Sequence, residues 1–124
     1  MIIGIGIDSI EVERVERQIL TESGLKEKLF SSREIAYCES KKGFAQHFAA
    51  RFAAKEAFMK ALGTGWREGI TFADIEVVND ALGKPELKLS GKAAELAKAR
   101  GVTAIHVSLT HLKQIATAIV TLEK

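Results

Sequence analysis

"FAQHFAARFAAKEAFMKAL", residues 44–62, is the stretch of this sequence on which the fold depends. Alanine is the strongest helix former, and Phe48, Phe52 and Met59 recur at helical spacing among the alanines. Gly63 follows directly, at the position where glycine commonly ends a helix. The stretch therefore predicts a long helix over residues 44–62 that is apolar around most of its circumference.

This predicted helix nevertheless carries three charged residues in its second half, Lys55, Glu56 and Lys60. Glu56 and Lys60 are four residues apart and share one face, whereas Lys55 points about 100° away around the axis. An exposed pair of this kind would stabilise the helix by only about 0.3–0.5 kcal/mol. On a narrow polar stripe that faces a cleft, the same pair suits phosphate chemistry, with the carboxylate binding Mg²⁺ and the ammonium neutralising a phosphate oxygen. Spacing alone favours the inert ion pair and leaves the phosphate site as the alternative.

Residues 1–8 form a nearly continuous apolar run that ends at Asp8. Such a run predicts a strand that is covered on both faces. A carboxylate at the end of a buried strand is a candidate metal or ligand site, whereas as the N-cap of a following helix it would have only a local role. If Asp8 lies near Glu56, the two carboxylates can share one hard cation.

Gly4 and Gly6 lie inside this apolar run and invite comparison with nucleotide-binding loops. A Rossmann fingerprint needs its glycines after the strand and a further glycine or alanine opening the helix, a position held here by Ser9. The sequence also contains no Walker A pattern, which excludes a P-loop. The two glycines instead predict that another backbone or a ligand approaches this strand closely.

The rest of the chain predicts short helices and two hairpins. Ser9 is a candidate N-cap for the next helix, and Ser31 with Glu34 has the spacing of a capping box. The predicted elements are a strand at 1–8, helices at 9–20, 31–39 and 44–62, strands at 72–80 and 85–90, a helix at 91–101, and strands at 104–111 and 115–123. This order predicts an α+β fold, with a small antiparallel-rich sheet packed on one long and several short helices, in a single domain over residues 1–124.

Composition excludes several classes of protein. With 124 residues, 47% of them hydrophobic and 27% charged, the chain has the profile of one globular domain. A net charge of +2 is too small to indicate nucleic-acid binding. The first residues contain neither a basic leader nor a span of membrane length, so we expect no secretory signal and no membrane anchor. The one cysteine, Cys38, suits a reducing compartment, and we expect a cytoplasmic protein.

The segment "HVSLTH", residues 106–111, carries a polar row. In a strand, His106, Ser108 and Thr110 share one face while apolar residues occupy the other. The row is either the solvated side of a sheet or a set of donors for a phosphate or nucleotide. A serine–histidine nucleophile that uses Ser108 has no supporting spacing.

Arg14, Arg17 and Gln18 share one face of the helix predicted after the first strand. Glutamates are interspersed among them, which makes an ordinary solvated surface the favoured interpretation. Binding of an acidic protein partner is the alternative.

Four stretches in this order and at this spacing resemble one family. They are "GIGIDSIEVER" at 4–14, "FAARFAAKEAFMKALGTG" at 48–65, "FADIEVVNDALGKPEL" at 72–87 and "HVSLTH" at 106–111. Together they resemble the bacterial holo-acyl-carrier-protein synthases, which are small 4′-phosphopantetheinyl transferases. The resemblance implies transfer of 4′-phosphopantetheine from coenzyme A to a serine hydroxyl of apo acyl carrier protein in fatty acid biosynthesis, with release of adenosine 3′,5′-bisphosphate.

The resemblance also implies roles for individual residues. Asp8 and Glu56 are expected to bind Mg²⁺, and Glu56 and Lys60 to act in catalysis. Contacts with coenzyme A are expected from Lys55, Lys60, Gly63, Lys84, Pro85, His106, Ser108 and Thr110. Contacts with the carrier protein are expected from Arg14, Arg17 and Gln18. The resemblance further implies a homotrimer in which coenzyme A lies between subunits.

Two functions of other classes remain as alternatives. One is a non-catalytic module that binds a nucleotide or an acidic protein and uses Glu56 and Lys60 as a surface ion pair. The other is a metal-dependent phosphohydrolase that needs no carrier. For the transferase, the residue that removes the proton from the serine hydroxyl stays open between Glu56, acting through a metal-bound water, and another group.

Overall fold

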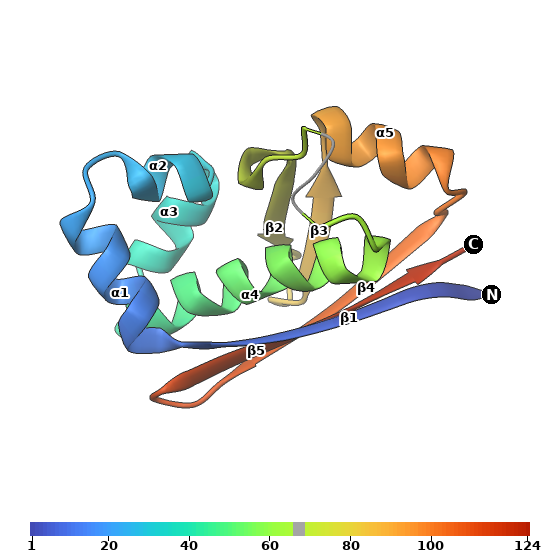
Figure 1. Cartoon of the computed structure of the whole chain (residues 1–124). Coiled ribbons are helices and arrows are strands. Elements are labelled where there is room, and N and C mark those ends of the chain that lie inside the picture. The colour runs from blue at the N-terminus through green and yellow to red at the C-terminus, as the bar shows by residue number, and fades with distance from the viewer. Residues whose placement is uncertain (66–68) are drawn as a thin grey trace.

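A computed structural model describes residues 1–65 and 69–124 of the chain (Figure 1). Its elements are β1 (Ile2–Glu11), α1 (Val12–Thr21), α2 (Leu25–Leu29), α3 (Ser32–Glu39), α4 (Phe44–Leu62), the 3-10 helix η1 (Phe72–Asp74), β2 (Ile75–Asn79), β3 (Pro85–Leu89), α5 (Gly91–Ala99), β4 (Ala104–His111) and β5 (Ile115–Glu123). The predicted α+β class is confirmed, and the long helix has the predicted bounds.

Helix α4 is the central element (Figure 1). An antiparallel sheet in the order β1-β5-β4 covers one side of the helix, and the antiparallel hairpin β2-β3 forms a second, separate sheet. Helices α1, α2 and α3 gather at the N-terminal end of α4, whereas α5 lies near its C-terminal end. Both predicted hairpins are confirmed, but residues 72–74, predicted as the start of a strand, form η1 instead.

The contact between β1 and α4 is a contact of backbones. A Cβ atom added at Gly6 would lie 1.9 Å from the carbonyl oxygen of Ala57, and one added at Gly4 would lie 2.1 Å from that of Ala61. No side chain fits in such a gap, so the two glycines allow the strand to lie directly against the helix. The predicted close approach of another backbone is confirmed.

Replacing Gly6 by alanine should therefore force β1 away from α4. We expect Gly6→Ala to lower the free energy of unfolding by about 1–3 kcal/mol or more, because backbone atoms cannot move aside as a side chain can. Gly43→Ala is the control, since its added Cβ meets only the flexible side chain of Gln46. Urea unfolding of both variants measures the difference, and equal stability of the two would contradict the close contact.

The end of β1 corrects three predictions. The strand continues three residues beyond Asp8 to Glu11, because β5 is long enough to pair with it as far as Glu11 opposite Ile115. Glu11 is the N-cap residue of α1, and its side chain makes no capping hydrogen bond. Ser9 does not cap the helix, and its hydroxyl lies 2.8 Å from that of Thr117 on the neighbouring strand. The interpretation of Asp8 as an N-cap is likewise wrong, since it lies inside the strand.

Helix α2 was not predicted, whereas the capping box at the start of α3 was. The five residues of α2 follow Gly24, which has a φ of 79°, and are too few to show a helical period. At α3, the backbone N–H of Glu34 donates to the Ser31 hydroxyl, and the backbone N–H of Ser31 donates to the Glu34 carboxylate. The predicted capping box is confirmed.

The outer face of the three-stranded sheet is uncovered. Ile3, Ile5 and Ile7 of β1 point away from α4, and the side chains of Ile5 and Ile7 are exposed. The prediction that this strand is covered on both faces is therefore not met within one chain. Among the described helices, none has the length and apolarity needed to cross a membrane.

Candidate active site

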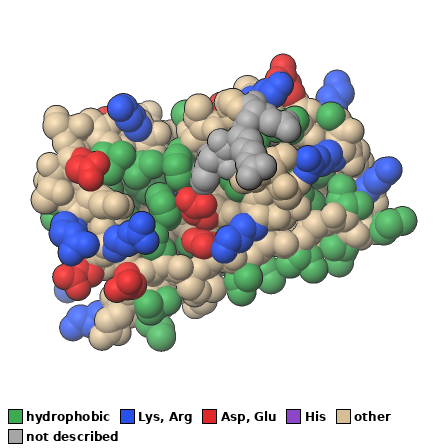
Figure 2. Space-filling view, in the orientation of Figure 1, with side chains coloured by type: hydrophobic (Ala, Val, Ile, Leu, Met, Phe, Trp, Pro, Cys, Tyr) green, Lys and Arg blue, Asp and Glu red, His purple; other side chains and the backbone are tan. Residues whose placement is uncertain are grey.

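One pocket collects the acidic residues singled out from the sequence. Asp8, Glu56 and Arg14 all line it, together with the ring of Phe52, and its volume is about 280 Å³. Three elements contribute these side chains, namely β1, α4 and α1. Figure 2 shows acidic and basic side chains next to each other near the centre of this face of the molecule. The structure thus brings both predicted metal ligands and one predicted carrier contact to one place.

The alternation of β1 directs Asp8 toward α4. Gly6 and Ile10, two residues before and after it, are buried on the same side of the strand. The side chain of Asp8 is 18% exposed. A carboxylate that is mostly enclosed but open to a pocket can accept a ligand from solvent.

Lys60 connects α4 to β1 at the edge of this pocket. Its ammonium lies 3.1 Å from Oδ1 of Asp8 and donates to the carbonyl oxygen of Ile7 at 3.0 Å. The Lys60 side chain is 56% exposed, so the ion pair is partly solvated and weak. An ammonium held in this way neutralises Asp8 and remains free to move to another anion.

The donor set of the pocket fits a hard cation. Within the described residues, no group of three or more histidine, cysteine or acidic side chains could hold a metal ion. Of the three acidic residues that line this pocket, Asp8, Glu11 and Glu56, the first and last are the predicted metal ligands. Mg²⁺ commonly takes one or two protein carboxylates and completes its shell with water or substrate oxygens. The pair is therefore suited to Mg²⁺ and poorly suited to a closed structural zinc site.

The predicted carrier contacts lie on the solvent side of α1. Val15 and Ile19 turn the apolar face of this helix toward the core, which leaves Arg14 and Arg17 exposed and Gln18 partly exposed. Arg14 also lines the pocket that contains Asp8 and Glu56, the acidic pocket. The face of α1 with Arg14, Arg17 and Gln18, its basic face, therefore directly adjoins this pocket.

A second pocket collects three of the predicted coenzyme A contacts. Lys84, Pro85 and His106 line a cavity of about 500 Å³ between β3, α5 and β4. The turn that carries Lys84 is held by Asp80, whose carboxylate accepts from the backbone N–H of Lys84 at 2.9 Å. Nε2 of His106 lies 3.0 Å from Glu123, and this hydrogen bond lowers the pKa of the Glu123 carboxyl.

The remaining predicted contacts lie outside both pockets. Ser108 and Thr110 follow His106 along the outer face of β4, opposite Ile119 and Thr117 of β5. Gly63 ends α4 in the left-handed region, with a φ of 82°. The polar row therefore faces away from α4, and Asp8 faces toward it. Within one chain, the sheet separates the row from the acidic pocket.

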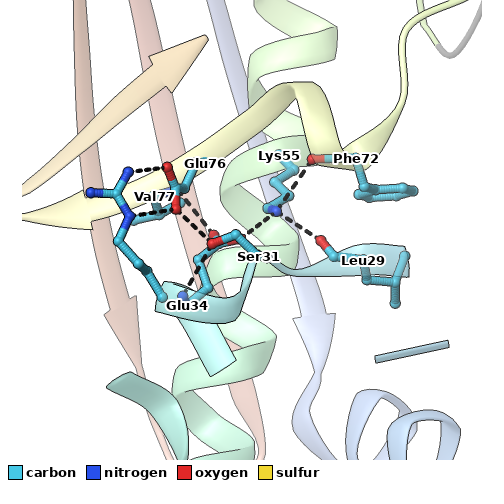
Figure 3. Close-up of polar contacts among 8 residues, drawn as sticks. Leu29, Ser31, Glu34, Lys55, Phe72, Glu76 and Val77 are labelled. Carbon is cyan, nitrogen blue, oxygen red and sulfur yellow. Dashed lines mark hydrogen bonds and ion pairs between the residues drawn. The ribbon is translucent and has the colours of Figure 1, made fainter. Parts of the chain in front are cut away.

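Lys55 does not lie where the prediction requires. Its side chain is fully buried, and its ammonium donates to Leu29, Glu34 and Phe72 (Figure 3). Burial lowers the pKa of this ammonium, and the Glu34 carboxylate beside it acts in the opposite direction. A group enclosed in this way cannot reach coenzyme A in the described conformation. The angular offset between Lys55 and Glu56 indicated that Lys55 lies on a different face of the helix. No sequence pattern predicted which oxygen atoms accept its hydrogen bonds.

The single cysteine is not a nucleophile. Cys38 is completely buried, and burial raises the pKa of its thiol to about 12. The thiol therefore stays neutral at physiological pH, which removes covalent catalysis by sulfur from the candidate reactions.

Comparison with known proteins gives the family. A profile of the 4′-phosphopantetheinyl transferase superfamily matches residues 4–120. The chain belongs to this superfamily. The holo-[acyl-carrier-protein] synthase of Geotalea daltonii, a curated relative, is 49% identical to it, and the match covers 100% of both chains.

Solved transferase structures share the whole fold. The holo-[acyl-carrier-protein] synthase from Neisseria meningitidis is 32% identical, with a TM-score of 0.88 and 100% of both chains covered. The enzyme from Bacillus anthracis, solved in complex with CoA (3′,5′-ADP), is 39% identical, with a TM-score of 0.80 over 98% of this chain and 96% of that one. The resemblance recognised from the four sequence stretches is confirmed.

Substitution of the two lysines of α4 should change the stability by very different amounts. Lys60→Ala should change the free energy of unfolding by less than about 1 kcal/mol, because its ion pair is largely exposed. Lys55→Ala should cost about 3–5 kcal/mol, because it leaves the Glu34 carboxylate buried without its cation. Chemical denaturation of both variants measures this contrast. Similar losses for the two would refute the different environments assigned to them.

Proposed function

We propose that the chain is a holo-[acyl-carrier-protein] synthase. It transfers 4′-phosphopantetheine from coenzyme A to a serine hydroxyl of apo acyl carrier protein and releases adenosine 3′,5′-bisphosphate, as a step of fatty acid biosynthesis. The observation that carries this proposal is the single pocket lined by Asp8, Glu56 and Arg14, with Lys60 at its edge. Membership of the transferase superfamily selects this reaction among those that such a pocket supports.

The chain's own residues meet the main demands of attack on a pyrophosphate. Such a reaction needs in-line positioning and neutralisation of charge more than a covalent intermediate. The exposed ammonium of Lys60 can leave Asp8 and bind a phosphate oxygen of coenzyme A. Mg²⁺ held by Asp8 and Glu56 would neutralise further phosphate charge. We assign acceptance of the serine proton to Glu56, which lines the same pocket.

The basic face of α1 is the proposed docking surface for the carrier protein. Arg14, Arg17 and Gln18 offer donors beside the acidic pocket, and guanidinium groups pair well with carboxylates of an acidic partner. Docking here would deliver the serine hydroxyl to Glu56. We also place the enzyme in the cytoplasm, where its buried Cys38 would stay reduced.

We further propose that the enzyme is a homotrimer that buries the outer face of the sheet. Ile5 and Ile7 of β1 and Ile119 of β5 expose 59%, 58% and 40% of their surface, and an apolar face of this kind indicates an interaction surface. The polar row of β4 faces the same side. In the trimer, coenzyme A would lie between the acidic pocket of one copy and Lys84, Pro85, His106, Ser108 and Thr110 of its neighbour.

The transfer reaction tests the proposed function directly. Purified protein with Mg²⁺, coenzyme A and an apo acyl carrier protein should add one phosphopantetheine group to the carrier, measured by intact mass. Asp8→Asn and Glu56→Gln should each lower kcat/KM by about 100-fold or more, because each removes a charge that the reaction uses. Glu95→Gln, on the exposed face of α5, is the matched control and should leave the rate unchanged.

The same assay separates the alternatives. Release of phosphate without a carrier would indicate a phosphohydrolase. Coenzyme A binding that is indifferent to Mg²⁺, with no mass gain on the carrier, would indicate a non-catalytic binding module. Either result would overturn the transferase.

The oligomeric state tests the proposed assembly. Sedimentation velocity should give about three times the chain mass of 13.5 kDa for the wild type and the chain mass itself for Ile5→Asp, because a carboxylate cannot be buried unpaired at the interface. Leu20→Asp is the matched control, since Leu20 is an exposed apolar residue of α1 away from the sheet. A wild type that stays monomeric at all concentrations would rule the trimer out.

A further inference from the structure

One buried ammonium connects four elements that are distant in the sequence. Nζ of Lys55 donates to the carbonyl oxygen of Leu29 at 2.7 Å, to Oε1 of Glu34 at 2.8 Å and to the carbonyl oxygen of Phe72 at 3.3 Å (Figure 3). Leu29 is the last residue of α2, Glu34 belongs to α3 and Phe72 opens η1. All three donors of the ammonium are therefore engaged, each with a different element.

The carboxylate of Glu34 is equally well bonded. Besides Lys55, it accepts the backbone N–H of Ser31 at 2.9 Å and that of Val77 in β2 at 3.0 Å. Only 1% of its side chain is exposed. The ion pair thus joins α4 to the α2–α3 region, to η1 and to the β2–β3 hairpin.

A contribution to stability does not by itself explain why Lys55 and Glu34 form a buried ion pair. Removing two charges from water is costly, and well-packed apolar side chains of similar volume often stabilise a core as much or more. What an ion pair adds is direction, because its hydrogen bonds tolerate only a narrow range of geometry. The directional hydrogen bonds of the ion pair matter for the orientation of α4.

Among the buried side chains of α4, two are charged, Arg51 and Lys55, and both make directional contacts that define its rotation. Most of its side chains are buried, and they are mainly alanines, distributed around the whole circumference. These alanines distinguish poorly between one rotation about the helix axis and another, so the larger buried side chains and the polar contacts must define it. The glycine contacts hold α4 against β1 on one side. Elsewhere on the helix, Arg51 donates to Oδ1 of Asn79 at 2.6 Å and Lys55 donates to Glu34, and Lys55 is the anchor directly beside Glu56.

The rotation of α4 determines where Glu56 points. Glu56 follows Lys55 directly, and consecutive side chains of a helix are separated by about 100°. Fixing the direction of the Lys55 side chain therefore fixes the direction of the Glu56 carboxylate, which lines the acidic pocket with Asp8.

The same ammonium also holds an aromatic wall of that pocket. Lys55 binds the carbonyl oxygen of Phe72, and the Phe72 ring stacks on the ring of Phe52, with centroids 5.3 Å apart and planes inclined by 22°. Phe52 lines the acidic pocket beside Glu56. A shift of η1 would therefore be transmitted to the pocket through the two rings.

We propose that Lys55 and Glu34 are positioning residues for the transfer reaction, whose buried ion pair fixes the rotation of α4 and the Phe52–Phe72 stack and so directs Glu56 toward Asp8. The proposal rests on the proposed transferase function. Neither residue contacts the substrates; both act through Glu56 and Phe52.

A double substitution separates positioning from stability. In Lys55→Met alone, the buried Glu34 carboxylate loses its cation, so the urea midpoint should fall sharply. Adding Glu34→Gln removes the remaining charge, and the midpoint should return close to that of the wild type. The double variant should nevertheless lose at least about tenfold in kcat at saturating Mg²⁺ and coenzyme A, with the KM for the carrier within about threefold of the wild type, because the basic face of α1 is not altered.

Binding of Mn²⁺, a probe for the Mg²⁺ site, provides a readout independent of turnover. Free Mn²⁺ measured by electron paramagnetic resonance should show about tenfold weaker binding to the double variant, since Glu56 no longer points steadily at Asp8. The control removes the surface ion pair between Lys26 and Glu39, which joins α2 to α3 at 2.7 Å without touching α4. The Lys26→Met, Glu39→Gln variant should keep wild-type kcat and Mn²⁺ affinity.

Each outcome decides between a positioning role and a purely structural one. A double variant with wild-type stability, kcat and Mn²⁺ affinity would overturn the proposal. If that variant does not fold, Lys55→Arg replaces it, because it keeps the charge while its planar fork cannot reproduce the three bonds of the ammonium. Wild-type kcat in folded Lys55→Arg, or failure of both variants to fold, would also overturn positioning. Absence of transfer by the wild type would instead overturn the proposed function, and the Mn²⁺ comparison would still test the geometry.

Discussion

The direct contact between the backbones of β1 and α4 is the constraint on which the acidic pocket depends. Gly6 lies against Ala57, and Gly4 lies against Ala61. Two residues of a strand advance by about 6.6 Å and four residues of a helix by about 6 Å, so the two elements stay nearly in step as they run in opposite directions. The next residue of β1 on this face is Asp8, which is brought to the part of α4 that carries Glu56.

The three charged residues in the second half of α4 serve different purposes because they lie at different angles around the axis. Lys55 faces the interior and is bonded to three protein oxygens. Glu56 lines the pocket, and Lys60 reaches from the helix edge to Asp8 while remaining more than half exposed. Under the proposed function, Lys60 moves to a phosphate and is solvated, whereas Lys55 holds the helix in place and is enclosed. The same residue type meets both needs on one helix.

Local patterns were sufficient to predict α4, the capping box of α3 and both hairpins, since each depends on residues close together in the sequence. The true end of β1 depends on the length of β5, more than a hundred residues later, and so Ser9 was assigned a cap that it does not make. Periodicity placed Lys55 away from Glu56 but could not say that this side was buried. Its acceptors, Leu29, Glu34 and Phe72, come from segments that only the tertiary structure brings together.

The apolar run at residues 1–8 predicts more burial than a single chain provides. Its pattern is that of a strand covered on both faces, yet only the face with Gly4, Gly6 and Ile10 packs against α4. The uncovered isoleucines share their face with the polar row of β4, on the side of the sheet opposite Asp8. In the proposed trimer, a ligand can contact the acidic pocket of one copy and the polar row of its neighbour at the same time. Under the proposed assembly, the hydrophobic effect that buries the isoleucines also completes the coenzyme A site, so that association and catalysis depend on the same surface.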